Sequence, residues 1–172
     1  GVDLSEEALR TARRNAAALP RRHRDSVSFR VGDAAVLDGL ADESVDRVIS
    51  VGALTHVPEK PAVFRAVGRI LRPGGRFLGI VSNGDYLWHT LVGPLLGRST
   101  RHLATDRFVR RRDVERYATD AGLSVAMICY WSFVPSGDMS RPVALLMKAL
   151  SVAGRGLGKR RLWGGLAFCV VK

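Results

Sequence analysis

Four short segments follow one another in the first half of the chain, and each joins an apolar run to a polar or glycine turn. They are GVDLS at residues 1–5, VGDA at 31–34, DRVISVGALTHV at 46–57 and ILRPGGRFL at 70–78. Strands that end in such turns are typical of an open α/β sheet whose strand ends form a nucleotide site. The pattern predicts a single α/β domain over residues 1–172, a length that supports one hydrophobic core.

The spacing of apolar residues places the regular elements along the chain. Helices are predicted over residues 6–18, 61–71, 112–121 and 143–153, and strands over 27–31, 45–51, 76–81, 123–132 and 166–171. Ser5 is a favourable N-cap for the first helix. Pro73 and the glycines after it end the second helix and lead into a strand. Residues 83–109 are expected to be irregular, and 155–161 to form a basic glycine loop.

Composition excludes several classes of protein. The longest apolar run, residues 143–153, is interrupted by Lys148 and is shorter than the ~20 residues that a membrane-spanning helix needs. The acidic pair Glu6-Glu7 does not fit the basic start of a secretory signal. Cys129 and Cys169 lie within apolar runs and are predicted to be buried free thiols. These features favour a cytoplasmic protein without a membrane span, and they leave its oligomeric state open.

The net charge of +11 raises the question of a nucleic-acid partner. All but four of the 27 basic residues are arginines, and they are scattered through nearly every predicted element rather than gathered in one patch. The densest clusters, at residues 110–112 and 159–161, fit either solvated positions or a phosphate-binding surface. A nucleic-acid partner is therefore not expected.

These segments resemble the class I S-adenosylmethionine-dependent methyltransferases, in particular the subgroup with small-molecule substrates. The resemblance extends from Gly1 to about Ile80 and is weaker at residues 108–123 and in the last strand. It implies a Rossmann-like, mostly parallel sheet of strand order 3-2-1-4-5-7-6 with an antiparallel last strand. Residues 123–132 and 166–171 would then be the sixth and seventh strands.

The resemblance also implies that the first strand, most of the second, and the family's G-x-G-x-G loop are absent from the N-terminal end of this sequence. The predicted strand at 27–31 would then either pair directly with 45–51 or lie detached from the sheet. A chain without that loop is expected to bind its cofactor poorly.

The cofactor implied by the resemblance is S-adenosylmethionine, and two carboxylates carry the assignment. Asp3 would accept hydrogen bonds from the ribose hydroxyls and Asp33 from the exocyclic amine of adenine, because a carboxylate is an acceptor only. Gly32 would form the turn before Asp33, Leu4 would pack on the adenine ring, and the Ala34 amide would face a ring nitrogen.

The resemblance places the acceptor side of the site after the fourth strand of the family. The backbone of Val51 and Gly52 would line the cofactor cleft, and His56 is the candidate catalytic base. The neighbouring segment holds further polar aromatic residues that fit packing or surface positions as well as an acceptor pocket: Tyr86, His89 and His102. The acceptor is expected to be a small molecule, which the sequence does not identify.

Two other functions stay open. A nicotinamide-dependent oxidoreductase also places an acid at the end of its second strand, although none of Tyr86, Tyr117 and Tyr130 has a lysine four residues later. A basic nucleic-acid-binding module, or a methyltransferase acting on RNA, would use the arginines. The chain has no strand in which aromatic and basic residues alternate, which disfavours a stacking platform.

Overall fold

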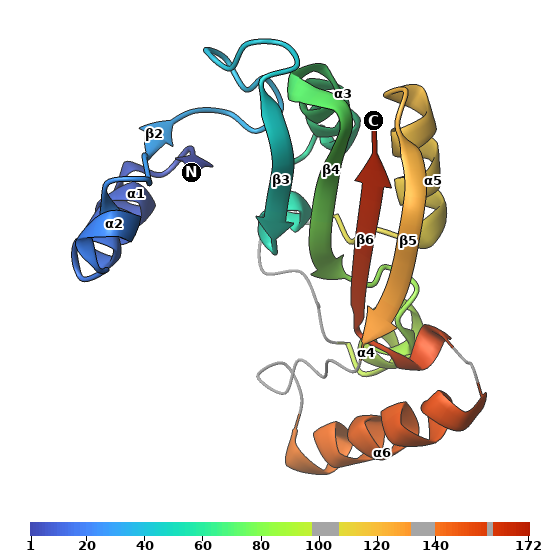
Figure 1. Cartoon of the computed structure of the whole chain (residues 1–172). Coiled ribbons are helices and arrows are strands. Elements are labelled where there is room, and N and C mark those ends of the chain that lie inside the picture. The colour runs from blue at the N-terminus through green and yellow to red at the C-terminus, as the bar shows by residue number, and fades with distance from the viewer. Residues whose placement is uncertain (98–106, 132–139, 158–159) are drawn as a thin grey trace.

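The computed structural model describes residues 1–97, 107–131, 140–157 and 160–172. Figure 1 shows a four-stranded sheet with α3 and α5 on one face, and a small N-terminal unit that projects to one side of it. The N-terminal unit contains β1 (Val2–Asp3), α1 (Glu6–Ala17), α2 (Arg21–Arg24) and β2 (Arg30–Val31). The remainder contains β3 (Val45–Val51), η1 (Ala53–Thr55), α3 (Lys60–Ile70), β4 (Leu71–Ser82), η2 (Trp88–Val92), α4 (Gly93–Leu95), α5 (Arg111–Asp120), β5 (Ser124–Trp131), α6 (Arg141–Leu157), η4 (Arg160–Leu162) and β6 (Gly165–Val171).

The element boundaries follow local chemistry. The Ser5 hydroxyl accepts a hydrogen bond from the Ala8 amide at 3.2 Å, so the predicted N-cap of α1 is confirmed. Gly74 adopts a φ of +78°, the left-handed conformation expected after Pro73. The Gly74 amide donates to the carbonyl of Lys172 at 2.9 Å. β4 starts at Leu71, five residues before the predicted start, where Leu71 pairs with Val45 of β3.

The strand order of the larger sheet is β3-β4-β6-β5. β3 and β4 are parallel, and β6 runs antiparallel to both β4 and β5. This is the 4-5-7-6 half of the order that the resemblance implied, with the antiparallel last strand in its expected place. The Rossmann-like α/β prediction is confirmed.

The predicted strand at 27–31 lies detached from the larger sheet, which is the second of the two arrangements considered. Only Arg30–Val31 has strand geometry, and it pairs in parallel with β1, matching Val2 with Arg30 and Asp3 with Val31. Among the described residues, β1 and β2 form a sheet of their own, and neither strand pairs with β3. The loop of residues 32–44 joins the two units.

Aromatic stacking forms the core between α3 and the sheet. The rings of Phe64, Phe77 and Phe168 lie with centroids 5.3–5.5 Å apart, and all three are buried. Gly79 leaves the space that the Phe168 ring occupies, since a Cβ on Gly79 would come within 2.1 Å of the ring. Burial of these large rings stabilises the sheet and fixes α3 upon it.

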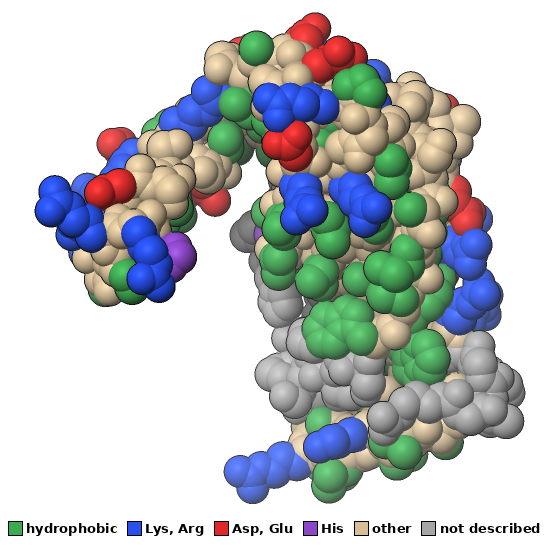
Figure 2. Space-filling view, in the orientation of Figure 1, with side chains coloured by type: hydrophobic (Ala, Val, Ile, Leu, Met, Phe, Trp, Pro, Cys, Tyr) green, Lys and Arg blue, Asp and Glu red, His purple; other side chains and the backbone are tan. Residues whose placement is uncertain are grey.

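None of the described helices that flank the four-stranded sheet covers its opposite face, the open face. Figure 2 looks onto this face, where hydrophobic side chains gather over the strands. Exposed apolar residues on β3 and β5 include Ile49, Val51, Met127 and Trp131. Cys129 shares this alternation and is exposed, so its predicted burial is wrong, whereas Cys169 is buried as predicted.

A second apolar cluster attaches α6. Tyr86 and Trp88 pack with Met147 of α6, and all three are buried. The expectation that residues 83–109 are irregular is wrong in part, because η2 is a π-helix over Trp88–Val92 and α4 a short α-helix over Gly93–Leu95. The predicted loop at 155–161 is wrong in part, because α6 continues to Leu157 and a short helix starts at Arg160. Within the described part of the chain, no helix is long and apolar enough to cross a bilayer.

Candidate functional site

Asp3 and Asp33 lie at the ends of two hydrogen-bonded parallel strands. Asp3 is the register partner of Val31, and the Gly32 amide donates to the Asp3 carbonyl at 3.1 Å. The two carboxylates therefore belong to one edge of the β1–β2 pair, as expected of residues that act on one ligand.

Each carboxylate also forms the same local turn. Asp3 Oδ1 accepts from the Ser5 amide at 2.8 Å, and Asp33 Oδ1 accepts from the Ala35 amide at 2.8 Å. Such Asx turns occupy one oxygen of each carboxylate. Both side chains are exposed, so each keeps an oxygen that a ligand can reach.

Small or apolar residues stand beside the two acids at this edge. Leu4 is exposed at 69 %, so a ligand at this edge can reach its side chain. Ala34 is half-buried against the main core. A Cβ on Gly32 would come within 2.9 Å of Val2 Cγ1, so a side chain at this position would push the two strands apart.

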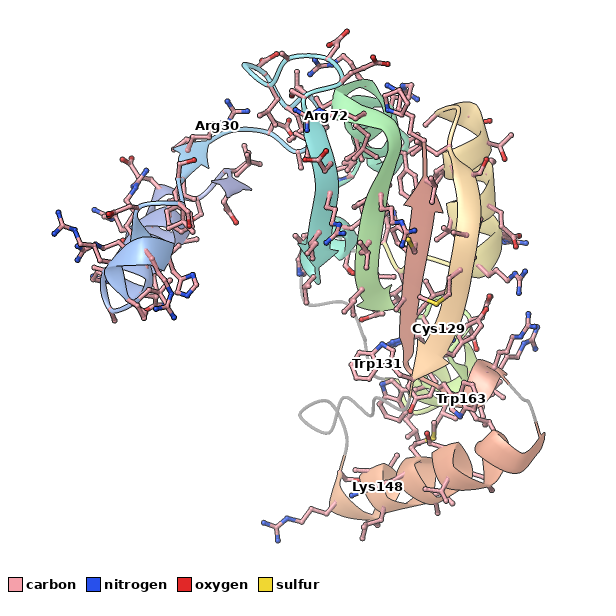
Figure 3. All side chains as sticks on the ribbon, viewed as in Figure 1. Arg30, Arg72, Cys129, Trp131, Lys148 and Trp163 are labelled. Carbon is pink, nitrogen blue, oxygen red and sulfur yellow. The ribbon has the colours of Figure 1, made fainter. Side chains whose placement is uncertain are left out.

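Val51 and Gly52 lie on the other unit, where β3 ends. Gly52 turns the chain with a φ of +76°, and its amide donates to the Ile80 carbonyl at 2.8 Å. With Ser82 and Trp131 they line an apolar pocket of about 510 Å³ on the open face of the sheet. Figure 3 places Trp131 at the end of β5 next to β6.

His56 ends the 3-10 turn that follows β3. Its amide donates to the Ala53 carbonyl at 3.0 Å, and its side chain is exposed. Buried Leu54 anchors this turn in the core. His56 thus belongs with Val51 and Gly52, whereas Asp3 and Asp33 lie on the separate β1–β2 pair.

One arginine positions the loop between the two groups. Arg69 of α3 donates through Nη1 to the Leu40 carbonyl at 2.8 Å and through Nη2 to the Leu37 carbonyl at 3.1 Å. It also pairs with Asp42 at 2.6 Å and reaches the Val36 carbonyl at 3.3 Å. This guanidinium holds the segment that follows Asp33 on the surface of α3.

A second pocket of about 510 Å³ lies between the beginnings of α3 and α5, and sequence reasoning missed it. Lys60 lines this pocket although its side chain is only 3 % exposed. The ammonium donates to the carbonyls of Val57 at 2.7 Å and Thr55 at 3.2 Å. No sequence signal marks Lys60 as buried, because it stands in a polar turn beside Pro58 and Glu59.

The aromatic residues considered for the acceptor side fulfil packing roles. His89 stacks on Phe108 with ring centroids 4.0 Å apart, and Tyr86 lies edge-on to His89 at 5.4 Å. Burial raises the pKa of the Tyr86 hydroxyl to about 12. His102 lies outside the described residues.

Comparison with known proteins points to one enzyme family. A family model described as "Methyltransferase domain" matches residues 1–79. An arsenite methyltransferase from Halobacterium salinarum is 43 % identical over 76 residues, 44 % of this chain and 18 % of that protein. A ubiquinone biosynthesis O-methyltransferase from Methylococcus capsulatus is 30 % identical over 133 residues, 73 % of this chain and 54 % of that protein.

These matches support a class I S-adenosylmethionine-dependent methyltransferase, of which the chain spans only part, since it covers 54 % or less of the length of these two relatives. The fold agrees: a S-adenosylmethionine-dependent methyltransferase from Methanosarcina mazei superposes with a TM-score of 0.66 at 17 % identity, over 100 % of this chain and 80 % of that one. Members of this family are enzymes that use S-adenosylmethionine as the methyl donor. The matches favour this family over the oxidoreductase and the nucleic-acid-binding module.

Proposed function

We propose that this methyltransferase transfers the methyl group of S-adenosylmethionine to a small-molecule acceptor. The bond from sulfur to the methyl carbon breaks as the acceptor's bond to that carbon forms, and S-adenosylhomocysteine leaves. In-line alignment of donor and acceptor supplies much of the acceleration in such a displacement. Relatives named for arsenite and for ubiquinone biosynthesis support a small acceptor.

The observation that carries this proposal is the pair of Asx turns at adjacent strand ends. In the proposed complex the reachable oxygen of Asp3 accepts from the ribose and that of Asp33 from the adenine amine. Leu4, Gly32 and Ala34 would bound the adenine ring.

On the second unit, Val51 and Gly52 would face the methionine side of the cofactor, and His56 would take a proton from an acceptor that carries one. Because these residues follow β3 and the two acids follow β1 and β2, the proposal requires the two units to meet around one ligand. The apolar pocket beside Val51 supports a site at this strand end.

Isosteric substitution tests the role proposed for Asp33. In Asp33→Asn the amide oxygen can keep the Ala35 hydrogen bond, while the side-chain NH2 opposes the adenine amine, donor to donor. Ultraviolet crosslinking of methyl-labelled S-adenosylmethionine to the purified protein reports even weak binding. We expect the half-saturation concentration to rise about tenfold to a hundredfold in this variant, since a charge-assisted bond contributes about 1.5–3 kcal/mol.

Asp38→Asn is the matched control, because Asp38 is an exposed acid of the same loop. It should label like the native protein, and an excess of NADH should not compete. Equal labelling of Asp33→Asn and Asp38→Asn would contradict the assignment of Asp33 to the cofactor site. Competition by NADH would instead favour the oxidoreductase.

A further inference from the structure

The pocket between α3 and α5 is distinct from the apolar pocket beside Val51. The two share no described lining residue. The described lining of the pocket between α3 and α5 comes from the start of α3, from Gly84 after β4, from η2, from residues 107–113 and from Tyr117 of α5. It therefore lies on the side of the sheet that the helices cover.

Cationic groups dominate the lining of this pocket. Lys60, Arg107, Arg110 and Arg112 all contribute to it, whereas of the described lining residues Asp113 alone carries a carboxylate. Asp113 is already engaged, because its Oδ2 accepts from the Arg110 amide at 3.0 Å. Asp85, which is not a lining residue, pairs with Arg110 at 3.5 Å. Lys60, Arg107 and Arg112 still outnumber the one lining carboxylate, so the pocket keeps a positive potential, which a concave site strengthens.

Backbone contacts hold the arginine-bearing segment in place. The Arg107 amide donates to the Thr55 carbonyl at 3.2 Å, and the Gly84 amide donates to the Val109 carbonyl at 2.9 Å. The pocket wall is thus tied both to η1 and to the end of β4. The arginines stand on a fixed support, which lowers the cost of ordering them around a ligand.

Both helices contribute further positive potential. α3 has 11 residues and starts at Lys60, and α5 has 10 residues and starts at Arg111. Each therefore directs the positive end of its dipole toward the pocket, and this adds to the charge of the side chains. Phe108 and Tyr117 also line the pocket, so apolar surface lies beside the cations.

We propose that this pocket binds the phosphate or diphosphate group of a small molecule. Guanidinium groups match phosphate oxygens with paired N–H donors, and several cations suit a polyvalent anion better than a monovalent one. Arg110 and Arg112 would donate hydrogen bonds to the phosphate oxygens. Arg112 is exposed, and Arg110 Nε lies 3.5 Å from Asp85 Oδ1. Lys60 contributes a buried positive charge, and the aromatic rings would contact the organic part. The site does not depend on methyl transfer.

Binding of inorganic pyrophosphate tests the proposal directly. Isothermal titration at constant ionic strength, without S-adenosylmethionine, compares the native protein with the double variant Arg110→Gln/Arg112→Gln. The control is Arg10→Gln/Arg14→Gln, which removes two exposed charges from α1. Thermal unfolding confirms that each variant is folded, and Arg112→Gln alone is the milder variant should the double variant unfold.

We expect saturable pyrophosphate binding that weakens at least tenfold in the pocket variant and is unchanged in the control. Inorganic phosphate should bind more weakly than pyrophosphate. Equal weakening in both double variants would mean diffuse attraction to a basic protein, as for a nucleic acid, and would overturn the proposal. Absence of saturable heat with the native protein would overturn it as well.

Discussion

Replacement of Arg69 by methionine is the most direct test of how the two units are joined. Two of the guanidinium's hydrogen bonds, to the Leu40 and Leu37 carbonyls, are partly buried. At about 1.5 kcal/mol each, these two contribute about 3 kcal/mol. The Asp42 carboxylate is 70 % exposed, so that ion pair adds less than about 1 kcal/mol. The long bond to Val36 adds little. We therefore expect Arg69→Met to lower the free energy of unfolding by about 3 kcal/mol.

Urea unfolding followed by far-ultraviolet circular dichroism measures this loss, and Arg72→Met is the control. Arg72 also reaches back to the preceding segment, through Asp46 at 2.7 Å and the Glu43 carbonyl at 3.2 Å, but these contacts are exposed. The control should lose less than about 1 kcal/mol. Arg69→Lys should recover only part of the loss, because one ammonium cannot reach acceptors spread along the loop. Equal losses in Arg69→Met and Arg72→Met would refute the reasoning.

Three further predictions concern the core. The Tyr86 hydroxyl has a pKa of about 12 in the folded protein and an ordinary value of 10.0, so the unfolded chain loses this proton first. The free energy of unfolding should fall by about 2 kcal/mol as the pH rises from 10 to 12, and Tyr86→Phe should abolish this part of the loss in alkaline urea titrations. Gly79→Ala should destabilise by about 1–3 kcal/mol because its Cβ displaces the Phe168 ring, and adding Phe168→Leu should restore part of the stability. Phe64→Ala should lower the free energy of unfolding by about 3–5 kcal/mol in urea titrations. A loss below about 1 kcal/mol would contradict the role given to the packing of Phe64 on Phe77 and Phe168.

The elements that sequence predicted well are those with strong local signals. The strand at residues 45–51 has its predicted bounds, and α1 starts after the Ser5 cap. Both depend on short-range periodicity and capping, which neighbouring residues determine. The class of fold followed from the order of such segments.

The features that sequence did not predict depend on contacts between distant segments. The apolar neighbours of Cys129 suggest burial, but the alternation of β5 places it on the open face of the sheet. The buried charge of Lys60 depends on carbonyls of the preceding turn, which no periodicity reveals. The same limit applies to the candidate site. The sequence indicates Asp3, Asp33 and Val51, but the placement of these residues relative to one another depends on the loop that Arg69 holds.

Trp131 gives the protein an optical reporter of its own. Trp88 is fully buried and the indole N–H of Trp163 is bonded to the Ser151 carbonyl, whereas Trp131 is 42 % exposed and borders the pocket beside Val51 and Gly52. Emission from an indole follows the polarity around it, so a molecule that displaces water there shifts the spectrum of this residue first. Occupancy of that strand end can thus be followed by fluorescence without a label.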